Sequence, residues 1–347
     1  MLLWKVPNGA TQEYFALFTQ VEAEFSLPHH LFSCTMRSEA PVALYAFDGT
    51  DDDDSHTGTD ADAVAADTNV YRFFSAYEGY AGAAATKYVP GVGTRFTVIG
   101  QALGGAFGLG WAPRVAETYD ALCANYVAGN QIIDVIGFSR GAAMALDFVN
   151  KVTTNGIQQG NAVIAPTPPI RFLALFDVVD AFGIANLGGP VSTFDPVHTL
   201  ALPSTVQHCF HAMALDERRP SFVNHRVDGA YEVWFRGVHS DIGGGNNNPG
   251  LEYVALRWML RKAIICGLPV TEANITDAAV HPEATIKPNF FSAHSDFWRT
   301  VRPTDLVHYA VAQHPIQAGE DCHALSGLNP IETVEAERTR LTTAMLT

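Results

Sequence analysis

Short apolar runs alternate with longer stretches of helical spacing along this chain. Runs of strand length occur at 41–47, 96–99, 131–137, 171–176 and 232–238. The spacing of apolar residues predicts helices over 115–126, 141–152 and 251–266. Because strands that alternate with helices usually form a parallel sheet with helices on both faces, the pattern predicts an α/β fold with a mostly parallel central sheet and helices on both faces.

The pattern also suggests how the chain is divided. Residues 1–40 precede the first strong strand and show helical spacing over 11–25, so we expect a helical extension that packs on the core. The remainder, 41–347, is expected to form a single catalytic domain. Two irregular stretches, 180–203 and 278–295, are rich in Gly, Pro and Asn. Since they exceed the usual length of a connection, we expect lid-like loops there.

Composition excludes several classes of protein. Hydrophobic residues make up 48% of the 347 positions, which is too apolar for a disordered chain. Lys and Arg number 21 against 36 Asp and Glu, which gives a net charge of −15. Such a field repels phosphate backbones, so we expect no nucleic-acid partner. Any membrane contact is expected to be transient, local and apolar.

The amino terminus contains no apolar run of seven residues, so we expect no secretory signal there. The five cysteines are odd in number and form no CxxC pair, which is typical of reduced thiols rather than of a disulfide framework. We therefore expect a cytoplasmic protein as synthesised, and export by a route without a cleaved signal is the alternative.

An acidic segment follows the first strand and contains four consecutive aspartates, Asp51, Asp52, Asp53 and Asp54. A calcium loop of the EF-hand type needs Gly at its sixth and Glu at its twelfth position. Neither the register that begins at Asp51 nor the one that begins at Asp53 satisfies both requirements. We interpret the segment as a solvated loop and expect no cofactor, with a divalent cation at these aspartates as the alternative.

The strongest chemical motif is G-x-S-x-G at 137–141, directly after one predicted strand and directly before a helix of small residues. This context is that of a nucleophile elbow, in which a serine sits on a sharp, strained turn. The motif predicts Ser139 as the nucleophile. The same turn is expected to direct the backbone N–H of Arg140 at an oxyanion.

A serine nucleophile needs an acid and a base, which follow it in this order along the chain of α/β-hydrolases. Asp241 and Asp177 both follow strands, and we favour Asp241 because glycines after it let a turn pass close to the site. His308 is the favoured base because it lies just past Pro303, near the start of an expected short helix. His294 is the next candidate, and His239 is the base if Asp177 is the acid.

Several motifs occur together in a fixed order: FDGT and TNVYRFF, YVPGVGT, GGAFGLGW, GFSRGA, FDVVDAFG, HAMALDERRPSF and WFRGVHSDIGGG. In this order they resemble an α/β-hydrolase domain of bacteria and fungi whose best understood members are type VI secretion phospholipase effectors. The resemblance covers about 41 to 315. It implies a serine esterase with Ser139, Asp241 and His308, and a second oxyanion N–H from Gly49 or Thr50.

The expected activity is acyl transfer from a phospholipid or another lipid ester through an acyl-enzyme. The apolar residues Phe107, Leu109 and Trp111 are candidates for the wall of an acyl-chain groove, and core packing is the alternative role for them. A small-ester hydrolase and a non-catalytic binding protein are the alternative functions. If the protein is an antibacterial effector, the resemblance implies type VI export, a secretion carrier and an immunity protein as partners.

Overall fold

The structure is a computed structural model, and it describes residues 41–49, 67–81, 85–91, 105–179, 200–219, 222–273, 275–286, 299–313 and 329–339. These residues belong to one compact unit, Ala40–Thr347. The expected extension over 1–40 and the predicted strand at 96–99 lie outside the described residues. Within the described part, no helix is both long and apolar enough to cross a lipid bilayer.

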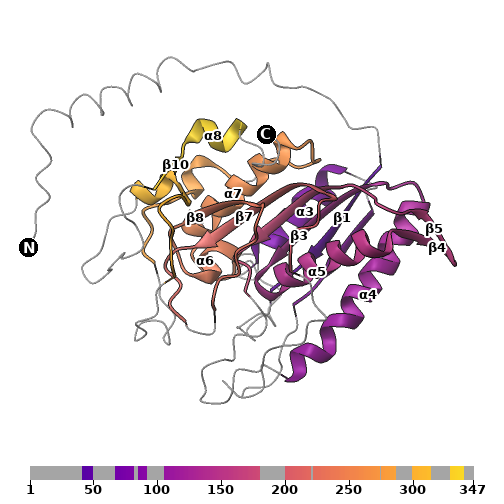
Figure 1. Cartoon of the computed structure of the whole chain (residues 1–347). Coiled ribbons are helices and arrows are strands. Elements are labelled where there is room, and N and C mark those ends of the chain that lie inside the picture. The colour runs from indigo at the N-terminus through magenta and orange to yellow at the C-terminus, as the bar shows by residue number, and fades with distance from the viewer. Residues whose placement is uncertain are drawn as a thin grey trace, which may run out of the picture. The chain divides into compact units, whose positions relative to one another are not determined.

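A sheet of eight parallel strands forms the centre of this unit (Figure 1), in the order β10-β9-β8-β7-β6-β3-β1-β2. Because the strands run in one direction, the residues that follow them gather along one edge. The strands are β1 (Val42–Phe47), β2 (Ala85–Val89), β3 (Ile132–Phe138), β6 (Ile170–Phe176), β7 (Val206–Ala214), β8 (Tyr231–Phe235), β9 (Leu306–His308) and β10 (Ile331–Glu332). A separate antiparallel pair consists of β4 (Ile157–Gln159) and β5 (Ala162–Ala165).

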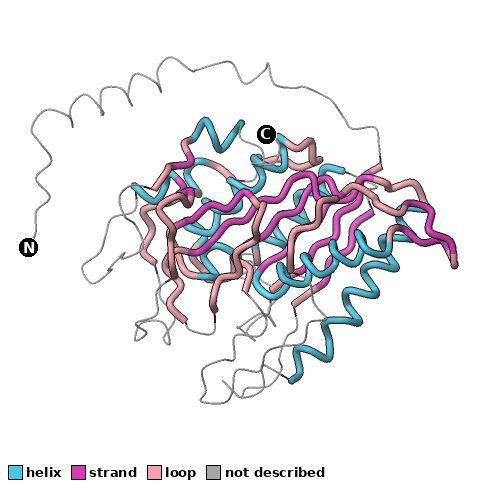
Figure 2. The backbone as a smooth tube through the Cα atoms, in the orientation of Figure 1, coloured by secondary structure: helices cyan, strands magenta, loops and turns pink. Residues whose placement is uncertain are grey.

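Both faces of the sheet are covered by helices (Figure 2). Side chains alternate between the faces along a strand, and β1 divides in this way between two apolar clusters. The first cluster includes residues of α3 (Asn69–Ala81) and α7 (Pro249–Ile265), and the second includes residues of α4 (Gly105–Val127) and α5 (Ser139–Asn155). The predicted fold class, a mostly parallel sheet between helical layers, is confirmed.

The predicted elements agree with the structure where the apolar pattern is long. The strands predicted at 41–47, 131–137 and 171–176 are β1, β3 and β6. β8 ends three residues before the predicted boundary at 238, because a turn with Gly237 at φ 125° follows it. α4 begins at Gly105 and includes the GGAFGLGW segment from its second glycine, although we expected a groove there.

The remaining described elements are short and lie beyond the central strands. They are α6 (His239–Gly243), α8 (Val334–Thr339) and the 3₁₀ turns η1 (Asp277–Ala279) and η2 (Tyr309–Gln313). Residues 180–199 of the first expected lid-like loop and 287–295 of the second lie outside the described residues. The described elements that matter for function are therefore the strands β3, β6 and β8 and the turns that follow them.

Candidate active site

Ser139 occupies the turn between β3 and α5. Its φ of 57° lies in the left-handed region, which is strained for a residue other than glycine and is found at nucleophile elbows. The two glycines of the motif make this turn possible. A side-chain carbon on Gly137 would lie 2.7 Å from Ala142 Cα, and one on Gly141 would overlap the carbonyl oxygen of Asp48. The helix therefore begins close against the sheet, with Ser139 at the carboxyl end of β3.

His239 is the side chain that contacts the Ser139 hydroxyl. It is the first residue of α6, just beyond β8, and its Nε2 lies 2.8 Å from Ser139 Oγ. Both residues are buried. The imidazole packs against the rings of Phe138 and Phe222, with centroid distances of 4.6 and 4.8 Å. These aromatic contacts hold the ring in the plane that points Nε2 at the serine.

Asp177 completes a continuous series of hydrogen bonds. It directly follows β6, and its Oδ2 lies 2.6 Å from His239 Nδ1. Its Oδ1 accepts hydrogen bonds from the Ala214 N–H at 2.9 Å and from the Asn224 amide at 3.1 Å. An ionised carboxylate can only accept, so Nδ1 carries the hydrogen and Nε2 accepts the proton of the Ser139 hydroxyl. The series is therefore arranged for the removal of that proton.

The charges around this series favour a neutral imidazole beside an ionised carboxylate. Arg299 forms a two-pronged ion pair with Asp177, with Nη1 at 2.5 Å from Oδ1 and Nη2 at 3.0 Å from Oδ2. Burial raises the pKa of Asp177, but the charge of Arg299 and the bond from His239 outweigh burial and hold that pKa well below its usual value. Burial lowers the pKa of His239 despite the opposing effect of Asp177. The imidazole is thus ready to accept a proton at neutral pH.

Asp241, the acid favoured by the sequence analysis, does not contact the His239 imidazole. Its Oδ2 accepts the Val238 N–H at 2.9 Å, and its Oδ1 accepts the amides of Asn246 and Asn248 at 2.8 and 3.1 Å. Burial raises the pKa of Asp241 to about 6. This carboxyl group therefore caps the start of α6, and the alternative acid Asp177 is the one that the structure brings to the imidazole.

His308, the favoured base, likewise makes no contact with Ser139. It ends β9, which lies four strands from β3 in the sheet order, a separation of about 19 Å at the usual strand spacing. Its ring stacks on Phe235 with a centroid distance of 4.5 Å, and its Nε2 is 3.9 Å from Glu337 Oε2. The structure joins Ser139 to His239, the alternative base of the sequence analysis. His294 lies outside the described residues.

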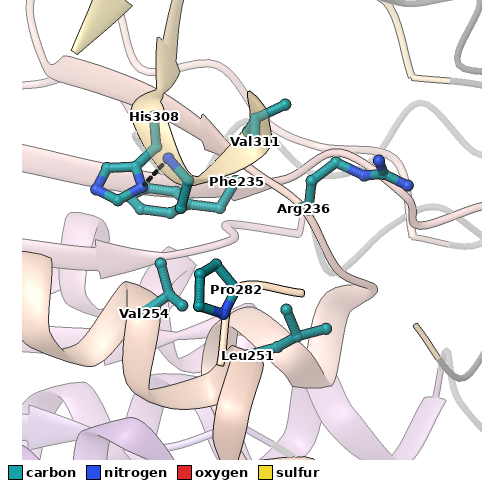
Figure 3. A pocket seen from close by; sticks show the side chains of 8 residues that line it. Phe235, Arg236, Leu251, Val254, Pro282, His308 and Val311 are labelled. Carbon is teal, nitrogen blue, oxygen red and sulfur yellow. Dashed lines mark hydrogen bonds between the residues drawn. The ribbon is translucent and has the colours of Figure 1, made fainter. Parts of the chain in front are cut away.

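The pocket beside His308 is separate from this series (Figure 3). His308 lies over Phe235 on one side of it, and Pro282 stands opposite. Its other lining residues are Arg236, Leu251, Val254, Ala310 and Val311. Ser139, His239 and Asp177 are not among the residues that line this pocket.

Of the residues expected to stabilise an oxyanion, Gly49 and Arg140 lie beside Ser139. A side-chain carbon built on Gly49 would lie 3.3 Å from Ser139 Cβ, so this glycine borders the serine. Its N–H, however, donates to Asp48 Oδ1 at 2.7 Å. Arg140 is the second residue of α5, where the N-terminal end of the helix favours a negative charge. Thr50 lies outside the described residues.

The candidate groove residues and the acidic segment are only partly described. Phe107 and Leu109 fall within α4, but their side chains lie outside the described set. Trp111 is buried, and its Nε1 donates to Asp147 at 2.7 Å, which is a core contact rather than a groove wall. The aspartates 51–54 are outside the described residues. Among the residues that are described, no group of three or more His, Cys, Asp or Glu side chains is arranged to hold a metal ion.

Sequence reasoning did not identify three polar residues that contact the series. Arg299 and Asn224 bind Asp177, and Glu217 Oε2 accepts the His239 N–H at 3.2 Å. Arg299 is 122 positions from Asp177 along the chain, and no local pattern marks it. Only the HAMALDERRPSF motif, which contains Glu217, offered a signal in the sequence.

Comparisons with known proteins place the site in a family. The model of the type VI secretion phospholipase effector Tle1-like catalytic domain matches residues 44–163 and 150–262, which together span more than half of the chain. No curated protein matches the sequence. Several solved structures are similar to this chain. One, a Tle1 effector bound to the VgrG spike from the type 6 secretion system, is 24% identical, with a TM-score of 0.42 over 61% of this chain and 52% of that one.

A second similar structure is that of an uncharacterized protein from Pseudomonas aeruginosa, which is 20% identical, with a TM-score of 0.44 over 75% of this chain and 48% of that one. The chain thus spans about half the length of both structures. The family model covers Ser139, Asp177 and His239, the three residues joined at the carboxyl edge of the sheet. The chain therefore belongs to the family described as the type VI secretion phospholipase effector Tle1-like catalytic domain.

Proposed function

We propose that this protein is a serine esterase that hydrolyses the carboxylic ester of a phospholipid or another lipid. The hydrogen-bonded series from Ser139 Oγ through the His239 imidazole to the Asp177 carboxylate carries this proposal. Its geometry is that of a nucleophile, a general base and an orienting acid. The strained backbone at Ser139 supports the same role, because strain of this kind concentrates at functional sites.

In the first half of the reaction, His239 Nε2 takes the proton as Ser139 Oγ attacks the ester carbonyl. Asp177 holds the Nδ1 hydrogen and stabilises the imidazolium that forms. When the tetrahedral intermediate collapses, the imidazolium gives its proton to the leaving alcohol, and an acyl-enzyme remains on Ser139. Water activated by His239 then releases the fatty acid and restores the serine.

The oxyanion of each tetrahedral intermediate needs two hydrogen-bond donors. We assign one to the Arg140 N–H, at the N-terminal end of α5. The second is the N–H of Thr50 rather than that of Gly49, because the Gly49 N–H already donates to Asp48. Asp48 therefore holds the backbone of Gly49, which directly precedes Thr50 in the chain.

The lipid substrate is supported by the family, whose description is that of a phospholipase effector. On the same basis we propose that the protein is exported by a type VI secretion system, with a spike component as its carrier and an immunity protein in the producing cell. The contact of Arg299 with Asp177 supports a catalytic domain that continues past residue 262 and occupies 41–347.

The test is hydrolysis by the full chain of phosphatidylcholine and phosphatidylglycerol vesicles and of p-nitrophenyl esters from acetate to palmitate. We expect release of fatty acid from the vesicles and a preference for octanoyl or longer chains. Ser139→Ala should lose this turnover, and Ser75→Ala, at an exposed position on α3, should retain it. Assays with calcium and with EDTA test whether the aspartates 51–54 contribute.

The alternatives give different results in the same assays. A preference for acetate, with no activity on vesicles, would identify a small-ester hydrolase. Absence of all turnover, with Ser139 unlabelled by a fluorophosphonate probe, would identify a non-catalytic binding protein and overturn the proposal. Comparison of the culture medium of the native host with that of a strain without the secretion apparatus tests export.

A further inference from the structure

Every hydrogen bond that the Arg299 guanidinium makes in the structure is to a group behind the His239 imidazole. Nη1 donates to Asp177 Oδ1 and to the Ala214 carbonyl at 2.8 Å. Nη2 donates to Asp177 Oδ2 and to the Phe222 carbonyl at 2.7 Å. The side chains of Arg299 and Asp177 are 2% and 0% exposed. The guanidinium is therefore a buried cation whose partners all surround the proposed catalytic acid.

We propose that Arg299 is a positioning residue for the reaction: it fixes the Asp177 carboxylate in the orientation that receives the His239 Nδ1 hydrogen, and it balances the buried charge of that carboxylate. This inference rests on the proposed esterase function, in which Asp177 orients the base. Arg299 lies beyond residue 262, where the match to the family model ends.

The orientation argument starts from the carboxylate itself. A carboxylate on a strand end can rotate, and a two-pronged arginine pair fixes its plane as well as its position. Asp177 has a φ of 41°, so its backbone also stands in a strained turn that side-chain bonds must hold. Because Arg299 also binds the Phe222 carbonyl, it holds the residue whose ring packs on His239. One guanidinium thus supports two contacts of the imidazole.

The charge argument concerns the balance around the imidazole. An uncompensated buried carboxylate would make His239 hold its proton more tightly, because an opposite charge favours the protonated imidazole. Asp177 and Glu217 supply negative charge next to the ring, and Arg219 and Arg299 supply positive charge. Asp241 is the acidic residue on α6 itself. Removal of Arg299 therefore leaves the negative charge of Asp177 unbalanced and should raise the pKa of His239.

The experiment measures the pH dependence of Ser139 labelling by a fluorophosphonate probe and of kcat/KM for p-nitrophenyl octanoate. The variants are Arg299→Met, which removes the charge, and Arg299→Lys, which keeps the charge but loses the fork. Arg171→Met is the matched control. Arg171 lies on β6 and pairs with the buried Asp134 on β3. Asp177 and Ser139 follow these same two strands, but the pair of Arg171 and Asp134 lies toward the amino ends of the strands. Thermal unfolding establishes that each variant is folded.

We expect Arg299→Met to lower the labelling rate roughly 10²-fold, as a misplaced catalytic group does. The acid limb of the pH profile of this variant should move to higher pH by on the order of one unit. In Arg299→Lys the rate should fall while the limb stays near that of the wild type. Arg171→Met should lower the melting temperature and leave the limb in place.

Other outcomes overturn the inference. The positioning role is excluded if the acid limb of the pH profile stays at the wild-type pH in Arg299→Met. It is also excluded if Arg299→Lys is labelled at the wild-type rate. Failure of both variants to fold would make Arg299 a requirement of the fold, which also contradicts the proposal. If the wild type and Arg171→Met are not labelled at all, the proposed esterase function fails instead, so the two failures are distinguishable.

Discussion

Asp177 and His239 are 62 positions apart in the chain, and their side chains meet with 2.6 Å between Oδ2 and Nδ1. The parallel sheet makes this contact. β6 ends just before Asp177, β8 ends just before the turn that leads to His239, and only β7 separates the two strands. Ser139 follows β3, the neighbour of β6 on the other side. Three turns at one edge of the sheet thus deliver the three side chains to one place.

The two aspartates should respond differently to the loss of charge. Asp177→Asn should lower kcat on the order of 10⁴-fold, because an amide oriented toward Nδ1 fixes the wrong tautomer of His239. Asp241→Asn should cost less than about tenfold, because Asp241 bonds the Val238 N–H and not the imidazole. Turnover of p-nitrophenyl octanoate by the two folded variants is the measurement. An equal or larger loss in Asp241→Asn would contradict the assignment of the acid.

Substitutions of the two candidate bases, His239 and His308, should also differ in their effects. His239→Ala should remove labelling of Ser139 by a fluorophosphonate, because no other described side chain accepts the serine proton. His308→Gln should be labelled at the wild-type rate, since His308 stacks on Phe235 at the end of β9. Near-UV circular dichroism confirms folding of both variants. Loss of labelling in His308→Gln alone would restore the sequence-based choice of base.

The environment of His239 predicts the acid side of the pH profile. Burial lowers the pKa of this imidazole below the ordinary value of about 6.5. In the proposed mechanism the neutral ring is the base, so we expect activity to be lost only as the pH falls through that lowered pKa. The acid limb of kcat/KM for a soluble ester should therefore have its midpoint below about 6.5. Because the substrate carries no titrating group, a midpoint above this value would contradict the neutral imidazole.

The sequence analysis predicted the strand, turn and helix around Ser139 correctly because their determinants are local. The turn glycines, the apolar strand before Ser139 and the small-residue helix after it are all within one short segment. The choice between Asp177 and Asp241, and between His239 and His308, depended on the order of strands in the sheet. Residues 236–238 form a turn rather than the end of β8, and this turn brings His239, not Asp241, to the serine. The contact of Arg299 with Asp177 could be identified only from the tertiary structure.

Asp48 should affect the rate through the turn that it holds beside Ser139. Its Oδ1 accepts the Gly49 N–H, and its Oδ2 accepts the hydroxyls of Thr68 and Tyr88. Asp48→Asn weakens these bonds and should lower kcat by about 10² with little change in KM, as the loss of one oxyanion donor does. Tyr88→Phe, which removes one hydroxyl, is the milder control. A change in KM alone would assign Asp48 to substrate binding instead.

Asp241 should make the stability of the protein depend on pH. Its pKa is about 6 in the folded protein and about 3.9 in an unfolded chain. Well below pH 4 the group is protonated in both states and contributes no pH dependence to the stability. As the pH rises toward 6, the unfolded state loses its proton first, so the free energy of unfolding should fall, by up to about 3 kcal/mol.

Urea unfolding of the wild type and of Asp241→Asn at pH 4, 5, 6 and 7 measures this contribution. The difference between the two proteins should change in favour of the variant as the pH rises, because the amide carries no charge to bury. A constant difference across this range would show that Asp241 is ionised as readily in the folded protein as in the unfolded chain.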